Sequence, residues 1–281
     1  DFEIVKSNKK ITYINIEAAF DIETTSMKIG DTKVAFMYVW MFGIEFGKET
    51  YYGRSWEEFV KLCEAIQHSF QLNEKRRLVI YVHNLGYEFQ FMRKYFEWTE
   101  VFSGSERKPM KAMTSLGIEF RDSYILSGYS LASTAKNLHS IKISKMVGDL
   151  DYSLIRTSDT PLTTEEWKYC DNDIQIILAY IKEQIAENGN ITKIPLTNTG
   201  RVRKYVRDYC YYKKSDGSKA GKGQYMRYRE LMGKLTLDTE TYQQLKRTFM
   251  GGFTHANAGH SNKVLTDVTS IDFTSSYPAV M

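Results

Sequence analysis

The sequence predicts a mixed α/β fold, in which helices flank a sheet of parallel and antiparallel strands. Runs of apolar residues rich in β-branched and aromatic side chains recur through the first half of the chain, as expected for strands. Other segments repeat their apolar residues with the spacing of an amphipathic helix. Three of these segments start at a serine or threonine that suits the N-cap position.

The first strands are expected to form an antiparallel meander. The first alternates and then becomes apolar, the second is a long β-branched and aromatic run, and the third returns beside it after a turn at Gly47. A buried strand and a further group of strands follow, the latter with turns at residues 103–104 and 116–117. In order, the predicted strands are residues 11–20, 34–46, 49–52 and 77–82, and segments within residues 100–126.

Helices are predicted between and after these strands. Ser55 suits an N-cap, and Glu58 three residues later completes a capping box. Thr163 or Thr164 begins the longest helix, whose apolar residues keep helical spacing to its end. The predicted helices are residues 55–70, 85–96, 130–138 and 163–187.

The composition is that of a globular protein from a reducing compartment. With 281 residues, of which 42% are hydrophobic and 26% charged, the chain can bury a full core. Its three cysteines are odd in number and lack metal-ligand spacing, which indicates free thiols. No apolar run reaches the roughly 18 residues of a membrane span, and the N-terminus has no signal-peptide pattern. We therefore expect a soluble, cytoplasmic protein that binds no membrane.

The character of the sequence changes after residue 190. Between Arg201 and Arg247, thirteen Lys or Arg residues stand against five Asp or Glu residues, whereas the net charge of the whole chain is only +4. Such an excess suits a segment that faces a polyanion, although a solvated helical face has the same pattern. We expect one domain over residues 1–190 and a second over residues 191–281. Within the second, a loop is expected at residues 215–223, a helix from Asp238 to residues 251–252, and strands within residues 263–273.

Four acidic residues occur in three short motifs. Asp21 and Glu23 follow the first apolar strand. Glu88 comes soon after the buried strand, and Asp173 lies in the long helix. Side chains two apart in a strand point to one face, where two like charges are unfavourable unless a cation lies between them. Each motif alone is also typical of surface charge or, for Glu88, of a favourable first helical turn.

Together the motifs indicate a metal site. All three fall where one sheet would gather them at its C-terminal edge, and carboxylate oxygens suit hard cations such as Mg²⁺ or Mn²⁺. Two such ions about 4 Å apart are a common device for cutting phosphodiesters. Tyr169 lies four residues before Asp173 on the same helical face, where its hydroxyl would orient an attacking water. The residues therefore predict a two-metal phosphodiesterase.

The ordered motifs resemble the three exonuclease motifs of family B DNA polymerases, and most of all the protein-primed branch found in bacteriophages and linear plasmids. The matching segments are Asp-Ile-Glu-Thr at residues 21–24, His-Asn-Leu-Gly-Tyr-Glu-Phe at 83–89 and Tyr-Cys-Asp-Asn-Asp-Ile-Gln-Ile-Ile at 169–177. Residues 249–253 resemble the Tyr-x-Gly-Gly segment between the exonuclease and polymerase domains of this family. Residues 272–278 resemble its first polymerase motif.

The resemblance implies a ribonuclease H-like 3′→5′ exonuclease fold, followed by a basic, mainly helical segment and the first strands of a polymerase palm. It implies two ions, Mg²⁺ or Mn²⁺, in the exonuclease site. It assigns Asp272 to a polymerase metal, and Ser275 and Tyr277 to the incoming nucleotide. The implied catalytic residues are Asp21, Glu23, Glu88, Tyr169 and Asp173, of which the four acids hold metal. The residues implied to hold the frayed DNA end are Thr24, Asn84, Tyr87 and Ser123.

Three positions depart from the family pattern. Glu88 stands where the family usually has Asp, so its carboxylate reaches further from the backbone. Phe249 replaces a Tyr and lacks its hydroxyl, and Ser276 replaces a Leu. The sequence reaches Met281 shortly after the first polymerase motif, without a second polymerase carboxylate. A complete polymerase site is therefore not expected from these residues alone.

The expected function is that of an N-terminal portion of a DNA-directed, protein-primed DNA polymerase, which removes nucleotides from single-stranded 3′ ends. The expected partners are single-stranded and primer-template DNA, with a terminal protein primer as a further candidate, and the expected state is a monomer. Three alternatives stay open. One is a stand-alone exonuclease of the same type. Another is a module that binds primer ends without cutting them because Glu88 displaces the metals. The third is a docking platform for the primer protein.

Overall fold

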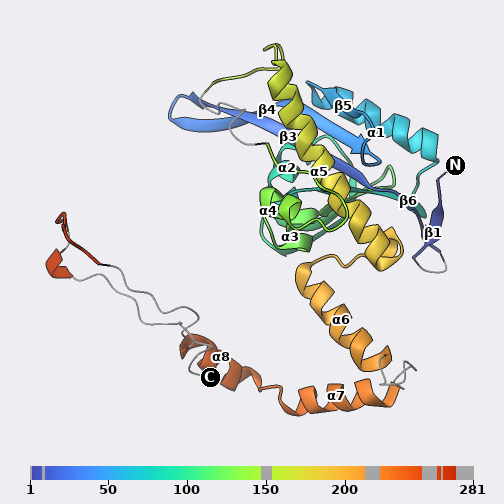
Figure 1. Cartoon of the computed structure of the whole chain (residues 1–281), viewed down its shortest axis with the longest axis vertical. Helices are drawn as coiled ribbons and strands as arrows, with labels where there is room; N and C mark the ends of the chain where they lie inside the picture. Colours follow the sequence, from blue (N-terminus) through green and yellow to red (C-terminus); the bar gives the residue numbers. More distant parts are fainter. Residues whose placement is uncertain are drawn as a thin grey trace. The chain divides into compact units, whose positions relative to one another are not determined.

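One mixed sheet organises the first part of the molecule. The computed structural model describes residues 2–7, 10–146, 154–212, 222–248, 258–260 and 262–269. The main path of the sheet has the strand order β5-β4-β3-β6-β9-β8-β7, and β2 pairs with β6. Figure 1 shows the two long strands β3 and β4 side by side. Strand β6 runs parallel to β2, β3 and β9, and the other pairs are antiparallel. The strands are β1 (Ile4–Lys6), β2 (Thr12–Ile14), β3 (Ala18–Ile29), β4 (Thr32–Ile44), β5 (Thr50–Gly53), β6 (Arg76–Val82), β7 (Trp98–Ser105), β8 (Lys108–Thr114) and β9 (Ile118–Asp122).

Capping sequences fix where the two longest helices beside this sheet begin. Ser55 and Glu58 form the predicted capping box of α1. Thr163 is the N-cap of α5 and forms a second capping box with Glu166. The helices are α1 (Trp56–Phe70), α2 (Leu85–Met92), α3 (Ser123–Ser127), α4 (Leu131–Lys136), α5 (Thr164–Asn188), η1 (Ile191–Lys193), α6 (Asn198–Tyr212), α7 (Lys222–Lys234), α8 (Thr239–Thr248) and η2 (Ala258–His260). None of those described combines the length and apolar character that a membrane span requires.

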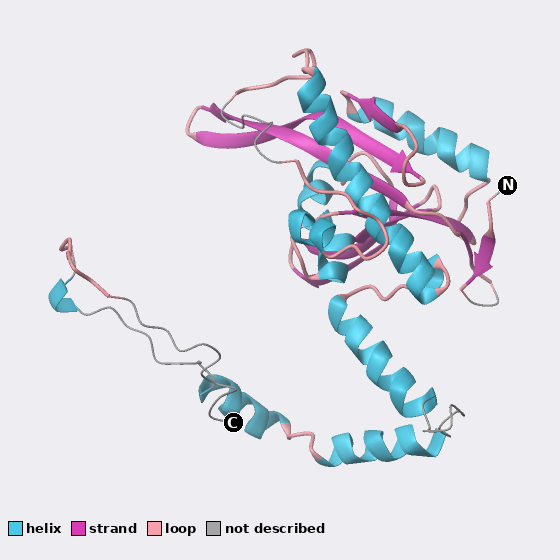
Figure 2. Cartoon of the chain, viewed as in Figure 1, coloured by secondary structure: helices cyan, strands magenta, loops and turns pink. Residues whose placement is uncertain are grey.

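The sheet separates two hydrophobic clusters. Alternate residues of β6 point to opposite faces, so Ile80 joins a cluster with residues of α1 and α2, whereas Tyr81 joins one with residues of α5. Figure 2 shows α5 crossing one face of the strands. The predicted mixed α/β fold, a mixed sheet flanked by helices, is confirmed.

Several predicted boundaries are wrong, because local contacts override the pattern. The strand predicted over residues 11–20 is two strands, since the Asn15 backbone N–H bonds to Glu3 and its side chain accepts from Ile191. The strand that carries Asp21 continues to Ile29, because it pairs with β4 along a long hairpin. The first meander strand therefore does not end at the acidic motif.

Three further expectations differ from the structure. Helix α2 ends at Met92 rather than residue 96, and the Trp98 indole donates to the carbonyl of Arg93 just after it. The turn expected at residues 103–104 lies inside β7, and the chain reverses at Arg107, which has a positive φ of 58°. No strand forms over residues 263–269. Val264 is 95% exposed, and no strand among the described residues pairs with this segment.

Gly117 lies in the turn between β8 and β9, where a side chain would not fit. Its φ is +83°, and a Cβ atom there would lie 2.6 Å from the backbone nitrogen of Asn73. We expect Gly117→Ala to lower the free energy of unfolding by about 2–4 kcal/mol. Gly30 has a φ of +59° but open space around it, so Gly30→Ala should cost only about 1–2 kcal/mol. Urea denaturation of both variants tests this difference, and equal losses would contradict the steric argument.

The chain divides into two compact units, residues 1–219 and residues 220–281. The described part of the second unit contains α7, α8 and η2. Asp238 accepts a hydrogen bond from the Thr241 backbone N–H at the start of α8, as predicted for an N-cap. The predicted end of that helix at residues 251–252 lies outside the described residues. The domain boundary near residue 190 stays a prediction.

Candidate active site

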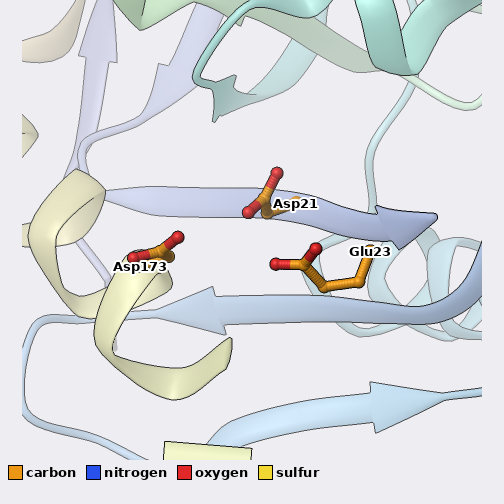
Figure 3. Close-up of side chains that lie close together, drawn as sticks. All are labelled: Asp21, Glu23 and Asp173. Carbon is orange, nitrogen blue, oxygen red and sulfur yellow. The ribbon is translucent and has the colours of Figure 1, made fainter. Parts of the chain in front are cut away.

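Three carboxylates from two elements meet on the face of the sheet that α5 covers. One carboxylate oxygen from each of Asp21, Glu23 and Asp173 can be chosen so that all lie within 4.8 Å of one another. Figure 3 shows the Asp173 side chain, which comes from α5, directed toward Asp21 on β3. The sequence prediction that these motifs gather at one place is therefore confirmed for these three residues.

The strand explains why the two acids of β3 share this face. Ala19 belongs to the hydrophobic cluster under α5, and side chains two residues apart point the same way. Asp21 and Glu23 therefore point toward α5, while Phe20 and Ile22 enter the opposite cluster. Parallel pairing of β3 with β6 includes Ala19 and Phe20, so Asp21 lies just past this pairing.

A β-bulge interrupts the hairpin beside the acidic pair. Glu23 pairs with Val39 and Thr24 pairs with Met37, so Tyr38 is the extra residue in β4. Tyr38 and Val39 consequently both belong to the cluster on the α5 face. Bulges of this kind re-aim side chains and are common next to active sites. The carboxylates thus lie at an irregularity within a strand, not at its end as predicted.

Burial and mutual repulsion disfavour the ionised forms of these acids. Burial, followed by the charge of Asp173, raises the pKa of Asp21 to about 7. Burial and the charges of Asp21 and Asp173 raise the pKa of Glu23 to about 8. Burial also raises the pKa of Asp173, against the attraction of Lys145. At neutral pH the cluster therefore retains protons unless a cation compensates its charge.

Lys145 supplies one such charge and was not predicted from the sequence. Its Nζ donates to both Asp173 oxygens, at 2.6 and 2.5 Å, and to the Tyr169 hydroxyl at 3.1 Å. The ammonium also lies 4.5 Å from the centre of the Tyr169 ring. Lys145 belongs to an irregular segment that follows α4, and no local sequence pattern marks it. Only its position in the fold identifies it.

Glu88 lies next to the cluster but is not one of its three central residues. It is buried in the first turn of α2. Burial, and then the charge of Asp21, raise the pKa of Glu88 well above its usual value. Its Oε2 atom is buried and has no hydrogen-bond partner among the described residues. This orphaned oxygen is a potential metal ligand.

The residues predicted to hold a DNA end lie within β3 and at the beginnings of α2 and α3. The hydroxyls of Thr24 and Tyr87 are 2.6 Å apart, and the Tyr87 side chain is 42% exposed. Asn84 is exposed at the N-cap of α2 in a left-handed conformation, with φ of 85°. Ser123 is only 1% exposed, and its hydroxyl donates to the Val82 carbonyl. The predicted polymerase residues Asp272, Ser275 and Tyr277, and the segment at residues 249–253, lie outside the described residues.

The donor set fits a hard divalent cation. Every candidate ligand is a carboxylate oxygen, which is the ligand type that Mg²⁺ and Mn²⁺ prefer. Burial and then like charges disfavour the ionised forms of Asp21 and Glu23 and raise their pKa values, and the buried Glu88 oxygen lacks a partner among the described groups. A cation would meet both needs.

Comparisons with known proteins show which proteins this chain resembles. No family model matches the chain. The DNA polymerases of Bacillus phages B103 and M2 are each 24% identical to it over 283 aligned residues, which cover 93% of this chain. The chain is similar to phage DNA polymerases over almost its whole length. It spans 43% of the length of each of these relatives.

Phage DNA polymerases also share its fold. Phi29 DNA polymerase complexed with single-stranded DNA superposes with a TM-score of 0.56, covering 87% of this chain and 41% of the polymerase. Phi29 DNA polymerase complexed with primer-template DNA and incoming nucleotides has a TM-score of 0.54, with 89% and 41% covered. Both are 18% identical to this chain. The sequence motifs predicted a resemblance to protein-primed DNA polymerases. These comparisons confirm that resemblance.

Proposed function

We propose that the carboxylate cluster is the active site of a metal-dependent 3′→5′ exonuclease that removes nucleotides from single-stranded DNA. The observation that carries the proposal is the meeting of Asp21, Glu23 and Asp173 oxygens within 4.8 Å. In a DNA polymerase, such a site would serve proofreading. The similarity of the chain to phage DNA polymerases supports this context.

The proposed metal ligands are Asp21, Glu23 and Asp173, with Glu88 completing the set through its unpaired oxygen. Two bound Mg²⁺ or Mn²⁺ ions would activate a water and offset the charge that develops on the leaving oxygen. The Tyr169 hydroxyl lies beside Asp173 and would orient that water. Lys145 holds both groups through its ammonium, which fixes their relative positions.

The surroundings of the cluster suit an unpaired DNA end. Tyr87 offers an exposed aromatic ring, on which a base can stack. Thr24 fixes that ring through the hydrogen bond between their hydroxyls, and the exposed Asn84 amide can donate to DNA. A base must leave its duplex to reach such a site, so mismatched ends would enter more readily than paired ones.

In the larger proposal, the chain is the N-terminal portion of a protein-primed DNA polymerase that acts on primer-template DNA in the cytoplasm of a host cell. The similarity to phage polymerases supports this proposal. A monomer that meets a terminal protein primer, and domains over residues 1–190 and 191–281, are parts of the same proposal.

Digestion of labelled oligonucleotides tests the exonuclease proposal. With Mg²⁺, we expect a 5′-labelled single strand to shorten one nucleotide at a time and to release 5′-monophosphates. A blunt duplex should be cut more slowly, because its end must fray first. Shortening from the 5′ end, internal cuts, or equal rates with and without a chelator would contradict the proposal.

One observation favours a second candidate, a module that binds DNA ends without cutting them. Lys145 donates to both oxygens of Asp173, so a protein cation already compensates one of the three central acids. Calorimetric titration with Mn²⁺ separates the candidates. Binding of two ions supports the exonuclease, whereas DNA binding without measurable metal binding supports the module.

A further inference from the structure

We propose that Asn172 is a positioning residue that places Lys145 in the carboxylate cluster. This inference rests on the proposed exonuclease function and assigns a role to a residue next to the predicted ligand Asp173. The lysine lies in residues 138–146, a segment without helix or strand after α4, and its long side chain has many rotamers.

The Asn172 amide binds the backbone on both sides of Lys145. Its Oδ1 accepts from the Met146 N–H at 3.0 Å, and its Nδ2 donates to the Ser144 carbonyl at 3.1 Å. Both flanking backbone groups are therefore held by one side chain. Asp173, the next residue of α5, receives the Lys145 ammonium. Two adjacent residues of one helix thus hold the lysine, one through its backbone and the other through its side chain.

The other contacts of the segment do not fix Lys145 locally. Glu183 accepts from the backbone N–H groups of His139, Ser140 and Ile141, but ten residues of helix separate it from Asp173, or about 15 Å. Ile141 and Ile143 pack against the cluster on the α5 face. The segment therefore stays attached to α5 without Asn172, while the lysine loses its local alignment.

Gln175 provides a matched control one turn further along α5. Its side-chain amide also binds one backbone N–H and one carbonyl, those of Gly47 and Lys48, at 2.9 and 3.0 Å. Those groups belong to the turn before β5 and do not touch Lys145. Each substitution removes bonds to one backbone N–H and one carbonyl from the same helix, and Gln175→Ala also removes a bond to the Thr50 hydroxyl at 3.4 Å. Only Asn172→Ala frees the lysine.

The experiment is a double-mutant cycle with the full chain. Single-turnover rates on a saturating 3′-labelled single strand with Mg²⁺ are measured for Asn172→Ala, Lys145→Ala, the double variant and Gln175→Ala. We expect Asn172→Ala to lower the rate constant about 10- to 100-fold with unchanged oligonucleotide affinity. In the Lys145→Ala background it should have almost no further effect, because a residue that acts through Lys145 is not additive with it. Gln175→Ala should stay within about 2-fold of the parent.

A second cycle, on the free energy of urea unfolding without metal, provides a readout independent of activity and shows that the variants fold. In this cycle too, Asn172→Ala should lower the free energy of unfolding by less in the Lys145→Ala background than in the parent. Multiplicative rate effects, or an unchanged rate in Asn172→Ala, would overturn the inference. Asp21→Asn tests the underlying function separately. Full activity in that variant would reject the exonuclease proposal, whereas an inactive Asp21→Asn with an active Asn172→Ala would reject only the role of Asn172.

Discussion

Replacing Asp21 by Asn is expected to abolish metal-dependent DNA cleavage and, at the same time, to raise the stability of the metal-free protein. Asp21 is a central ligand of the proposed site, and its loss should lower the rate at least about 10³-fold. Burial and the charge of Asp173 raise its pKa to about 7, so above this pH the ionised group destabilises the fold. Asn keeps the shape and removes the charge. The gain in free energy of unfolding should be about 1–3 kcal/mol at pH 8.

The two opposite effects distinguish a lost ligand from a misfolded variant. Digestion of a labelled single strand measures the rate, and urea denaturation in a chelator measures the stability. Asp171→Asn is the control, because Asp171 lies on α5 but binds Thr50 instead of the cluster. It should keep the parent activity. An Asp21→Asn variant that cuts DNA normally, or that is less stable than its parent, would show that the cluster has another purpose.

Stabilisation by Mg²⁺ is expected to grow with pH. The folded-state pKa values of Asp21 and Glu23 are about 7 and about 8, both above their usual values of 3.8 and 4.5. Between the usual and the raised pKa values, the folded protein binds more protons than the unfolded chain. Without metal, the free energy of unfolding therefore falls as pH rises through this range. In the proposed site Mg²⁺ would bind the deprotonated acids and therefore compete with protons. Its effect should be small at pH 5.5 and large at pH 8.5.

Thermal melts at both pH values, with and without Mg²⁺, measure this linkage. At 100 times the dissociation constant, a ligand adds about 2.7 kcal/mol. In a chain of this size this corresponds to about 5–10 °C at pH 8.5. The Asp21→Asn, Glu23→Gln double variant should show no such increase. An increase that is equal at pH 5.5 and pH 8.5 would mean that Mg²⁺ binds elsewhere.

The sequence allowed the acids to be placed because strand periodicity is simple. Alternation along β3 puts Asp21 and Glu23 on one face regardless of the rest of the fold. Helical spacing likewise puts Tyr169 and Asp173 together on α5. Both predictions need only local geometry, and the structure confirms that Asp21, Glu23 and Asp173 meet.

Other features of the site depend on contacts that no local pattern encodes. Lys145 reaches Asp173 from 28 residues away, through a segment without regular structure. The bulge at Tyr38 follows from how β3 and β4 pair, since neither strand contains a glycine or proline there to mark it. Such features need the assembled sheet and the packed α5 before they can be identified.

Strand β3 alternates between two chemical environments over four consecutive residues. Phe20 and Ile22 fill the apolar cluster with α1, and Asp21 and Glu23 form the acidic cluster with α5. A slip of one residue in the pairing of this strand would exchange the two faces. Two carboxylates would then enter a hydrocarbon interior, and two large apolar side chains would occupy the proposed metal site. An insertion or deletion here would therefore remove stability and activity together, whereas point substitutions can separate them.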